Sequence, residues 1–428
     1  MTRQTVPVGG DSRAEAAAPR WRRGYLDSIA AALPAIMVFL AVLAIPLSSA
    51  HAFSLTDGQL ASWIFALYAG PGLLGLVLAL RYHQPLVLTG NVFAIILFAS
   101  EGSRLAFPEL AGAAVIAGAA VAILGLVGLS GRLARVIPAP IVLGLVAGAV
   151  LPFVVRTFTN VEQDPIVVGG SIVGYVVGRR FIRSVTPLLP ALLVGVGAAA
   201  ISGQLGPLPA FVPPSIAVTS PQLTLQAVAT VTPVLVVIML LQANVPSIVF
   251  LRSQGYDPPE REIDVVSGIG TVGLSILGPN AVSVPLPIMP LVAGPDCGAH
   301  ERRQRAALAA GLGLVVIGLF AGVAVGLLRF LPIVLIQALA GLALIGVLTT
   351  SLKQVVGGPL VLGPVFAFAT VQSGLSLLGL GPFFWGLVIG VIVSYVLERS
   401  ELAALRGISR HVPSSERPRS EPRPGLGG

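Results

Sequence analysis

Residues 278–297 read GPNAVSVPLPIMPLVAGPDC, a stretch with five prolines and no charged side chain before Asp296. Proline removes a backbone N–H donor and breaks the interior of a helix. The residues between the prolines are mostly valine, leucine, isoleucine and methionine, which favour burial. The segment is apolar enough for a membrane but cannot form an unbroken helix, so its role depends on the rest of the chain.

The composition is that of an integral membrane protein. Of the 428 residues, 55% are hydrophobic and only 10% are charged, whereas a soluble domain carries roughly 25% charged residues. The mean hydropathy is +0.92. A helical crossing takes about 20 apolar residues, and long uncharged windows of this kind recur along the chain. The alternating strand pattern of an outer-membrane barrel is not seen.

Apolar segments predict fourteen membrane spans. They lie near 28–48, 60–80, 84–100, 110–131, 136–155, 165–179, 185–203, 224–250, 264–277, 280–294, 306–328, 331–350, 358–378 and 382–397. With this count, all but three of the 26 lysines and arginines fall on the side of the two termini, the exceptions being Arg104, Arg156 and Arg329. Because these residues concentrate on the cytoplasmic side, we expect both termini in the cytoplasm.

The two ends of the chain are polar. Residues 1–26 lack the early apolar core of a cleaved signal peptide and are predicted to be a disordered cytoplasmic tail. Residues 399–428 form a second cytoplasmic tail, whose Pro/Ser/Arg-rich end is also predicted to be disordered. The net charge of +8 comes from arginines in loops and tails. It therefore follows the positive-inside rule and does not indicate a nucleic-acid partner.

Fourteen spans suggest two sets of seven. Residues 127–150 resemble residues 322–345, and an Arg-x-x-Pro pair recurs in both at an offset of 194 residues. The matched residues are Arg135, Pro138, Arg329 and Pro332. Because seven is odd, the second copy is inverted in the membrane, an arrangement common among secondary transporters. The predicted parts are repeat 27–203, extracytoplasmic loop 204–223 and repeat 224–398.

The same offset relates the opening stretch to the first repeat. It maps residues 280–294 onto residues 86–100, so that Ser283 corresponds to Thr89. Residues 265–295 hold two predicted crossings in 31 residues, where two helices need about 40. Spans 3 and 10 are therefore expected to contain short extended breaks, which a membrane tolerates only where they are buried in protein or line a cavity.

Paired broken spans mark the substrate site of many transporters. A half-helix that follows extended backbone presents free N–H groups and a positive dipole end near the midplane. Two such ends would form a site suited to a carboxylate without a buried arginine.

Ionisable groups are scarce in the spans. No Asp, Glu, Lys, Arg or His lies centrally in a predicted span, and Asp27, Glu109 and Asp264 lie at span starts, where helix capping explains them. The single cysteine, Cys297, excludes an intrachain disulfide. This pattern predicts no metal site, no cofactor, no catalytic residues and no enzyme.

Neutral polar side chains remain as candidates for contact with a substrate. Gln242 and Asn244 lie in the eighth span, where interhelical hydrogen bonding is an equal interpretation. Capping by Asn91 and ordinary packing by Phe93 are the alternatives in the third span. The candidate substrate-binding residues are Thr89, Gly90, Asn91, Phe93, Gln242, Asn244, Ser283, Val284 and Leu286.

Four runs of this sequence resemble the benzoate transporter family of the BenE type. They lie at 60–87, 135–151, 240–259 and 375–393, within a likeness that covers about residues 25–398. The most specific run is LLQANVPSIVFLRSQGYDPP (240–259). The resemblance implies a benzoate/proton symporter of the bacterial inner membrane. A homodimer is kept as a further expectation.

More distantly, the layout is similar to that of the uracil/xanthine permeases. This similarity implies a core domain and a gate domain, short strands in spans 3 and 10, and substrate held between these breaks and spans 1 and 8. Two acidic residues of those permeases fall near Gln242 and near Pro285–Leu286 here. The replacement fits an anionic substrate and leaves the proton-coupling residue unassigned.

The sequence thus predicts an all-α polytopic membrane protein that imports benzoate or a related aromatic carboxylate with a proton by alternating access. The expected partners are this carboxylate, the proton and the lipid bilayer. A carrier of a nucleobase or an inorganic anion on the same fold, or an anion channel, remains the alternative.

Overall fold

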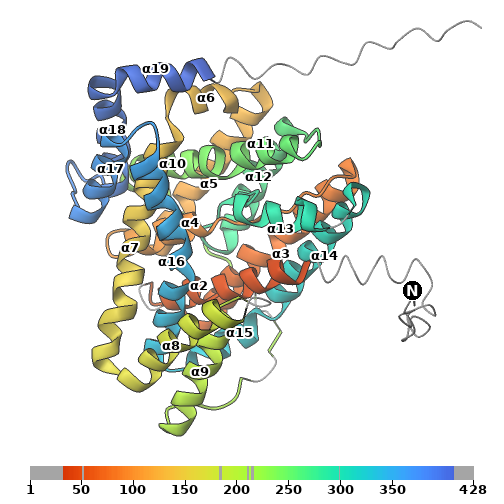
Figure 1. Cartoon of the computed structure of the whole chain (residues 1–428), viewed down its shortest axis with the longest axis vertical. Helices are drawn as coiled ribbons and strands as arrows, with labels where there is room; N and C mark the ends of the chain where they lie inside the picture. The colour runs from red at the N-terminus through yellow and green to blue at the C-terminus, as the bar shows by residue number, and fades with distance from the viewer. Residues whose placement is uncertain are drawn as a thin grey trace, which may run out of the picture.

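The computed structural model describes residues 32–50, 53–182, 186–209, 212–213, 216–297 and 299–408, and these residues are mostly helical (Figure 1). The first half contains a helix over Ala32–Ser49 that ends in α2 (Ala44–Ser49), then α3 (Asp57–Tyr82), β1 (Thr89–Gly90), α4 (Val92–Glu101), α5 (Phe107–Val127), α6 (Ser130–Val136), α7 (Ala139–Gln163), α8 (Pro165–Phe181) and α9 (Leu188–Ile201). The tail predicted over residues 1–26 lies outside the described residues.

The second half repeats this order of elements. It contains α10 (Leu225–Val237), a π-helical stretch (Ile238–Asn244), α11 (Val245–Ser253), α12 (Glu260–Leu274), β2 (Val282–Ser283), a 3-10 turn (Leu286–Ile288), α13 (Met289–Ala293), α14 (Arg303–Leu319), α15 (Ala321–Phe330), α16 (Ile333–Gly357), α17 (Leu362–Ser373), α18 (Pro382–Leu397) and α19 (Arg399–Ile408). The tail predicted from residue 399 therefore begins as a helix, and residues 409–428 lie outside the description.

Many helices have the length and composition of membrane spans. Among the described residues, six helices are long and apolar enough to cross a membrane, and a seventh arises if α14 and α15, bent by 59°, count as one span. Four shorter apolar helices are α4, α9, α17 and α18. Each of the fourteen predicted spans coincides with a helix or with extended backbone leading into a short helix. The number of crossings itself stays a prediction.

Two helices stand in the register that the offset of 194 residues predicts. Helices α7 and α16 each have 25 residues, and their first residues, Ala139 and Ile333, lie 194 positions apart (333 − 139). Each follows a proline in extended conformation at the N-cap, Pro138 or Pro332. Proline is compatible with a helix start because the N–H that it lacks has no partner there.

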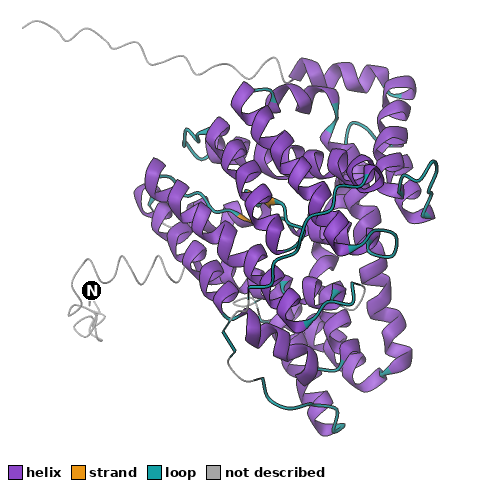
Figure 2. Ribbon diagram, turned by 180° about the vertical axis from the view of Figure 1, so that it is seen from behind, coloured by secondary structure: helices purple, strands orange, loops and turns teal. Residues whose placement is uncertain are grey.

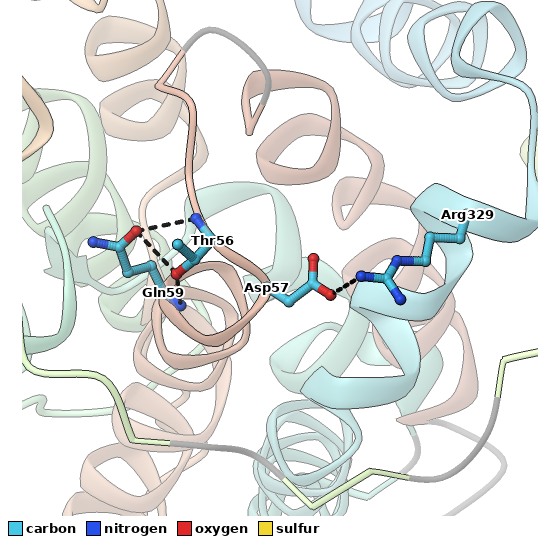
Figure 3. A network of polar contacts seen from close by, with 4 residues as sticks. All are labelled: Thr56, Asp57, Gln59 and Arg329. Atoms are coloured by element: carbon cyan, nitrogen blue, oxygen red, sulfur yellow. Dashed lines mark hydrogen bonds and ion pairs between the residues drawn. The ribbon is translucent and has the colours of Figure 1, made fainter.

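The start of α3 shows how local capping sets a helix boundary. The Thr56 hydroxyl accepts a hydrogen bond from the Gln59 N–H at 3.3 Å, and the Gln59 side chain accepts one from the Thr56 N–H at 3.0 Å (Figure 3). This reciprocal arrangement satisfies two N–H groups that lack helical partners. The next residue, Asp57, forms an ion pair with Arg329 at 2.5 Å, which ties α3 to α15 (Figure 3).

The helices pack in two groups that lie side by side (Figure 1). In one group, α3 packs on α14, and α5 packs on α12 and α10. In the other, α7 packs on α16 and α17, α17 packs on α18, and α8 packs on α9. Contacts between the groups include α2 with α16, α4 with α7 and α10 with α18. The two short strands lie near the middle of the molecule (Figure 2).

Candidate substrate-binding site

The two broken spans meet through their extended backbones. Strands β1 and β2 pair antiparallel, with Thr89 opposite Ser283 and Gly90 opposite Val282. The Asn91 N–H extends this pairing by donating to the carbonyl oxygen of Ala281 at 2.7 Å. The extended breaks expected in spans 3 and 10 are thus present, and they pair at the two positions related by the offset of 194 residues.

Asn91 organises the first break. Its side-chain oxygen accepts hydrogen bonds from the N–H groups of Phe93 at 2.9 Å and Ala94 at 3.3 Å, which makes it the N-cap of α4. Its amide nitrogen donates to the Ser283 hydroxyl at 2.9 Å. One side chain therefore starts the helix and fastens it to the other strand, which gives the capping interpretation a direct structural basis.

Neighbouring helices hold the second break. The Val282 N–H donates to the Thr271 hydroxyl at 2.8 Å, and the Val284 N–H donates to the Asn244 side-chain oxygen at 2.9 Å. The carbonyl oxygen of Val284 accepts from the Ser247 hydroxyl at 2.9 Å. The prolines of this segment leave few N–H donors for a regular helix, so side chains of α11, α12 and the π-helical stretch satisfy the backbone instead.

A cavity of about 140 Å³ lies at the paired strands. Seven of the nine predicted residues line it, namely Thr89, Gly90, Asn91, Phe93, Gln242, Ser283 and Leu286. Its other walls come from the first helix, α3, α14 and α16, which contribute residues that the sequence did not indicate. These include Val38, Phe39, Val42, Leu67, Tyr68, Leu314, Ala343, Leu344 and Val347. The single sequence signal for them is that they are apolar and lie on helices.

Asn244 and Val284 do not line the cavity. Both are fully buried, and Asn244 lies behind β2, where its amide nitrogen donates to the Asp264 carboxylate at 2.9 Å and to the Ser267 hydroxyl at 3.2 Å. The prediction that Asn244 contacts substrate is therefore replaced by a supporting role. The reason is that both ends of its amide are already occupied, one by α12 and the other by Val284.

Two predicted caps have different outcomes. The Glu109 carboxylate accepts from the Ala106 N–H at 2.8 Å, so its capping role at the start of α5 is confirmed. Asp264 does not cap α12, because that helix begins at Glu260 and Asp264 lies one turn inside it. Asp264 is buried, with 3% of its surface exposed. It is thus a buried carboxyl group one helical turn inside a predicted span. Asp27 lies outside the described residues.

Gln242 belongs to the π-helical stretch Ile238–Asn244. Pro246, four residues later, has no N–H to donate to the Gln242 carbonyl, so the regular helical pattern cannot continue through this point. Such π-helical turns are frequent at functional sites. Gln242 faces the cavity, and its side-chain oxygen is buried without a hydrogen-bond partner. Of the lining groups, this amide is the one most available to a bound molecule.

The chemistry of the cavity is that of neutral donors beside apolar walls. No Asp, Glu, Lys, Arg or His is among the lining residues. Val92 and Leu286 are the first residues of α4 and of the 3-10 turn, so their N–H groups lack a partner within their own helix. Among the described residues, no group of three or more potential metal ligands occurs. The arrangement can bind a small molecule with one polar end and one apolar end.

Comparison with known sequences relates the chain to benzoate carriers. The family model "BenE: Benzoate membrane transport protein" matches residues 26–396. The benzoate membrane transport protein of Acinetobacter baylyi is 26% identical over 375 residues, which are 86% of this chain and 94% of that protein. The inner membrane protein YdcO of Escherichia coli is 26% identical over 354 residues, which are 80% of this chain and 88% of that protein.

Solved structures of anion transporters share the fold. The transmembrane domain of the cyanobacterial bicarbonate transporter BicA has a TM-score of 0.53 and 15% identity, covering 86% of this chain and 98% of that domain. The mouse anion transporter solute carrier 26 family member A9, in its inward-facing state, has a TM-score of 0.53 and 14% identity, covering 96% and 77%. At these identities the likeness concerns the fold alone, and similarity to uracil/xanthine permeases stays a prediction. By the family match, this chain belongs to the BenE benzoate membrane transport family, a family of membrane transporters rather than enzymes.

Proposed function

We propose that this protein imports benzoate or a related aromatic carboxylate across the bacterial inner membrane together with a proton, by alternating access. The observation that carries the proposal is the cavity at the paired strands, with its neutral polar end and its apolar walls. A carrier needs a site that a substrate can leave as well as enter, and hydrogen bonds from neutral donors suit this requirement better than a buried ion pair, which is costly to separate.

The size of the cavity fits a single aromatic ring. An engineered protein cavity of about 150 Å³ lined by apolar side chains binds benzene, and the cavity here measures about 140 Å³. Phe93, Val38 and Leu344 are among its apolar lining residues. Aromatic rings pack favourably against such side chains, and Phe93 can contribute an edge-to-face contact.

The carboxylate would lie at the end of the cavity where the two breaks meet. The N–H groups of Val92 and Leu286, at the starts of their helices, are suited to an anion because the helix dipole is positive there. The Gln242 amide can donate to the same group. Thr89 and Ser283 carry hydroxyl groups at the paired strands and complete the polar end.

The packing of the helices supports two inverted repeats of seven spans. If the halves are exchanged, the pair α3–α14 becomes the pair α12–α5, and both pairs pack closely. In the same way α8–α9 becomes α17–α18, and α7–α17 becomes α16–α8, which also pack. Inverted repeats with the site between them are a common architecture for alternating access.

We assign the group with α3, α5, α10 and α12–α15 to a core domain, and the group with α7–α9 and α16–α18 to a gate domain. The cavity lies where they adjoin, because α16 supplies one wall and the strands supply another. Movement of one group against the other would expose the cavity to each side of the membrane in turn. Cytoplasmic termini and a homodimer remain parts of this proposal.

Uptake of labelled benzoate into proteoliposomes under an inward proton gradient tests the function. We expect accumulation that collapses with a protonophore, and competition by aromatic carboxylates but not by benzyl alcohol, uracil or sulfate. Uptake no greater than in protein-free vesicles, by folded protein, would reject the substrate. Large uncoupled currents in planar bilayers would indicate an anion channel instead.

A further inference from the structure

Two adjoining cavities lie one helical turn beyond the substrate site along the same helices. The smaller, of about 70 Å³, is lined by Ser48, Ser49, Ala99, Phe153, Arg156 and Gln337. The larger, of about 210 Å³, shares Ala99, Phe153 and Arg156 with it. On α4, Ala99 lies four residues after Ile95, which lines the substrate cavity. That separation is about 6 Å along a helix. We call the two cavities together the vestibule.

The vestibule lies at the end of α7 that the distribution of charges places outside the cytoplasm. Arg156 is 17 residues after Ala139, the first residue of α7 (156 − 139). That distance is about 26 Å along a helix, close to the thickness of the hydrocarbon core. Gly341 of α16 lies against Thr157 and the Phe153 carbonyl, so close that a Cβ atom would approach within 2.4 Å of that oxygen. This close approach brings Gln337, one turn earlier on α16, to the same cavity as Arg156.

Arg156 differs from the other two arginines predicted on this side. The Arg329 guanidinium pairs with Asp57, and the Arg104 guanidinium donates to the Gly374 carbonyl at 2.8 Å. For the Arg156 guanidinium no hydrogen bond or ion pair occurs with any residue that the structure describes, and its side chain is exposed. Arg156 thus has its full donor capacity available at the vestibule.

The donor set of the vestibule selects an anion. Gln337 accepts through its side-chain oxygen from the Asn160 amide at 2.9 Å, which leaves its own NH₂ group as the free end. Ser48 and Ser49 both donate to the Ile45 carbonyl. The free N–H donors are therefore those of Arg156 and Gln337, and no carboxylate lines either cavity. A planar guanidinium beside an amide donor matches a carboxylate.

We propose that Arg156 and Gln337 form an outer binding site for the carboxylate of the substrate, with the Phe153 ring against its apolar part. This inference rests on the function proposed above and extends it, because it adds an encounter site that precedes the neutral inner site. A single unpaired cation in a cleft raises the local concentration of an anion and its rate of entry. The neutral inner site then receives the carboxylate without an ion pair that must be broken in each cycle.

Chemical protection tests the outer site independently of transport. Full-length protein in detergent is treated with p-hydroxyphenylglyoxal, and modification of individual arginines is followed by peptide mass spectrometry. Benzoate should slow modification of Arg156 several-fold, whereas benzyl alcohol at the same ionic strength should not. Arg104 and Arg329 serve as internal references. Equal rates at Arg156 with benzoate and benzyl alcohol would overturn the proposal, whatever the transport assay shows.

Kinetics of uptake provide the second test. Arg156→Gln should raise the KM for benzoate about tenfold, the effect of losing one charge-assisted contact, with little change in kcat. It should also flatten the fall of kcat/KM with rising salt. Arg156→Lys should be intermediate, because it keeps the charge but loses the planar fork. Lys353→Gln, which removes an exposed charge elsewhere on α16, is the matched control. A wild-type KM and salt dependence in Arg156→Gln would reject the vestibule while leaving benzoate transport in place.

Discussion

The two broken spans occupy equivalent positions in the two halves, but they are held in different ways. In the first, Asn91 caps α4 from within its own segment, and the helix that follows has ten residues. In the second, no side chain of the segment caps the 3-10 turn after Pro285, and α13 has only five residues. Its backbone is satisfied instead by Asn244, Ser247 and Thr271.

The difference shows that an inverted repeat can preserve a register without preserving its support. Thr89 and Ser283 remain paired although one break is stabilised locally and the other by distant residues. A segment with five prolines has few N–H groups to place in a helix, so it depends on its neighbours. The second break should therefore be sensitive to substitutions outside its own sequence, and the first to substitutions within it.

Asn244→Ala should have the largest effect on stability. It leaves the Val284 N–H and one interaction of the Asp264 carboxyl without a partner, at a cost of about 1–3 kcal/mol for each buried group. The melting temperature in detergent should fall markedly, and uptake should be lost with it. An unchanged melting temperature would contradict the supporting role that we assign to Asn244.

Asn91→Ala should come second. Loss of an N-cap costs about 0.5–2 kcal/mol, and the bond to Ser283 is lost as well. We expect a moderate fall in melting temperature and uptake near background. Asn91→Ser separates the two roles, because serine can cap a helix but is too short to replace the amide that reaches Ser283. Recovery of stability without recovery of uptake is the expected result, and recovery of both would show that the bridge to Ser283 is dispensable.

Gln242→Ala should reduce transport without reducing stability. The Gln242 side-chain oxygen has no partner in the folded protein, so truncation leaves no buried group unsatisfied. Loss of one hydrogen bond to a charged ligand corresponds to about a tenfold rise in KM. The contrast with Asn244→Ala, two residues away, sharpens the distinction between lining and supporting side chains. A drop in melting temperature equal to that of Asn244→Ala would remove the distinction.

Glu398 offers a smaller test of support from a distant residue. Its carboxylate accepts from the N–H groups of Val361 at 2.6 Å, Leu362 at 2.7 Å and Gly363 at 2.9 Å, and so caps α17 from the end of α18. Burial opposes ionisation of Glu398, but these N–H groups outweigh it and hold its pKa below the ordinary value. The carboxylate therefore contributes stability above its unfolded-state pKa, and this contribution is lost as pH falls through the lowered folded-state pKa.

Glu398→Gln should accordingly lower the melting temperature by a few degrees at neutral pH. The gap between wild type and variant should narrow as the pH is lowered through the acidic range, because the wild-type carboxylate then becomes protonated. Melting curves over a pH series measure this gap. A gap that is constant with pH would show that the charge of Glu398 is not what stabilises the start of α17.

The sequence alone determined the class of protein, the positions of the broken spans and the register that joins them. Hydropathy and proline act over a few residues, so the apolar, proline-rich stretch at 278–297 had to be a broken crossing. The repeat offset then related Ser283 to Thr89, and the paired strands bear this out. The cap at Asn91 could be expected for the same reason, because its partners are two and three residues away.

Only the tertiary structure decided which polar side chains face the cavity and which lie behind it. Gln242 and Asn244 differ little in sequence context, yet one is free at the cavity and the other is bound to Asp264 and Val284. The walls from the first helix and α16, and the pairing state of Arg156, depend likewise on segments far apart in the chain. Local propensities cannot specify such contacts, because they arise only when many helices pack together.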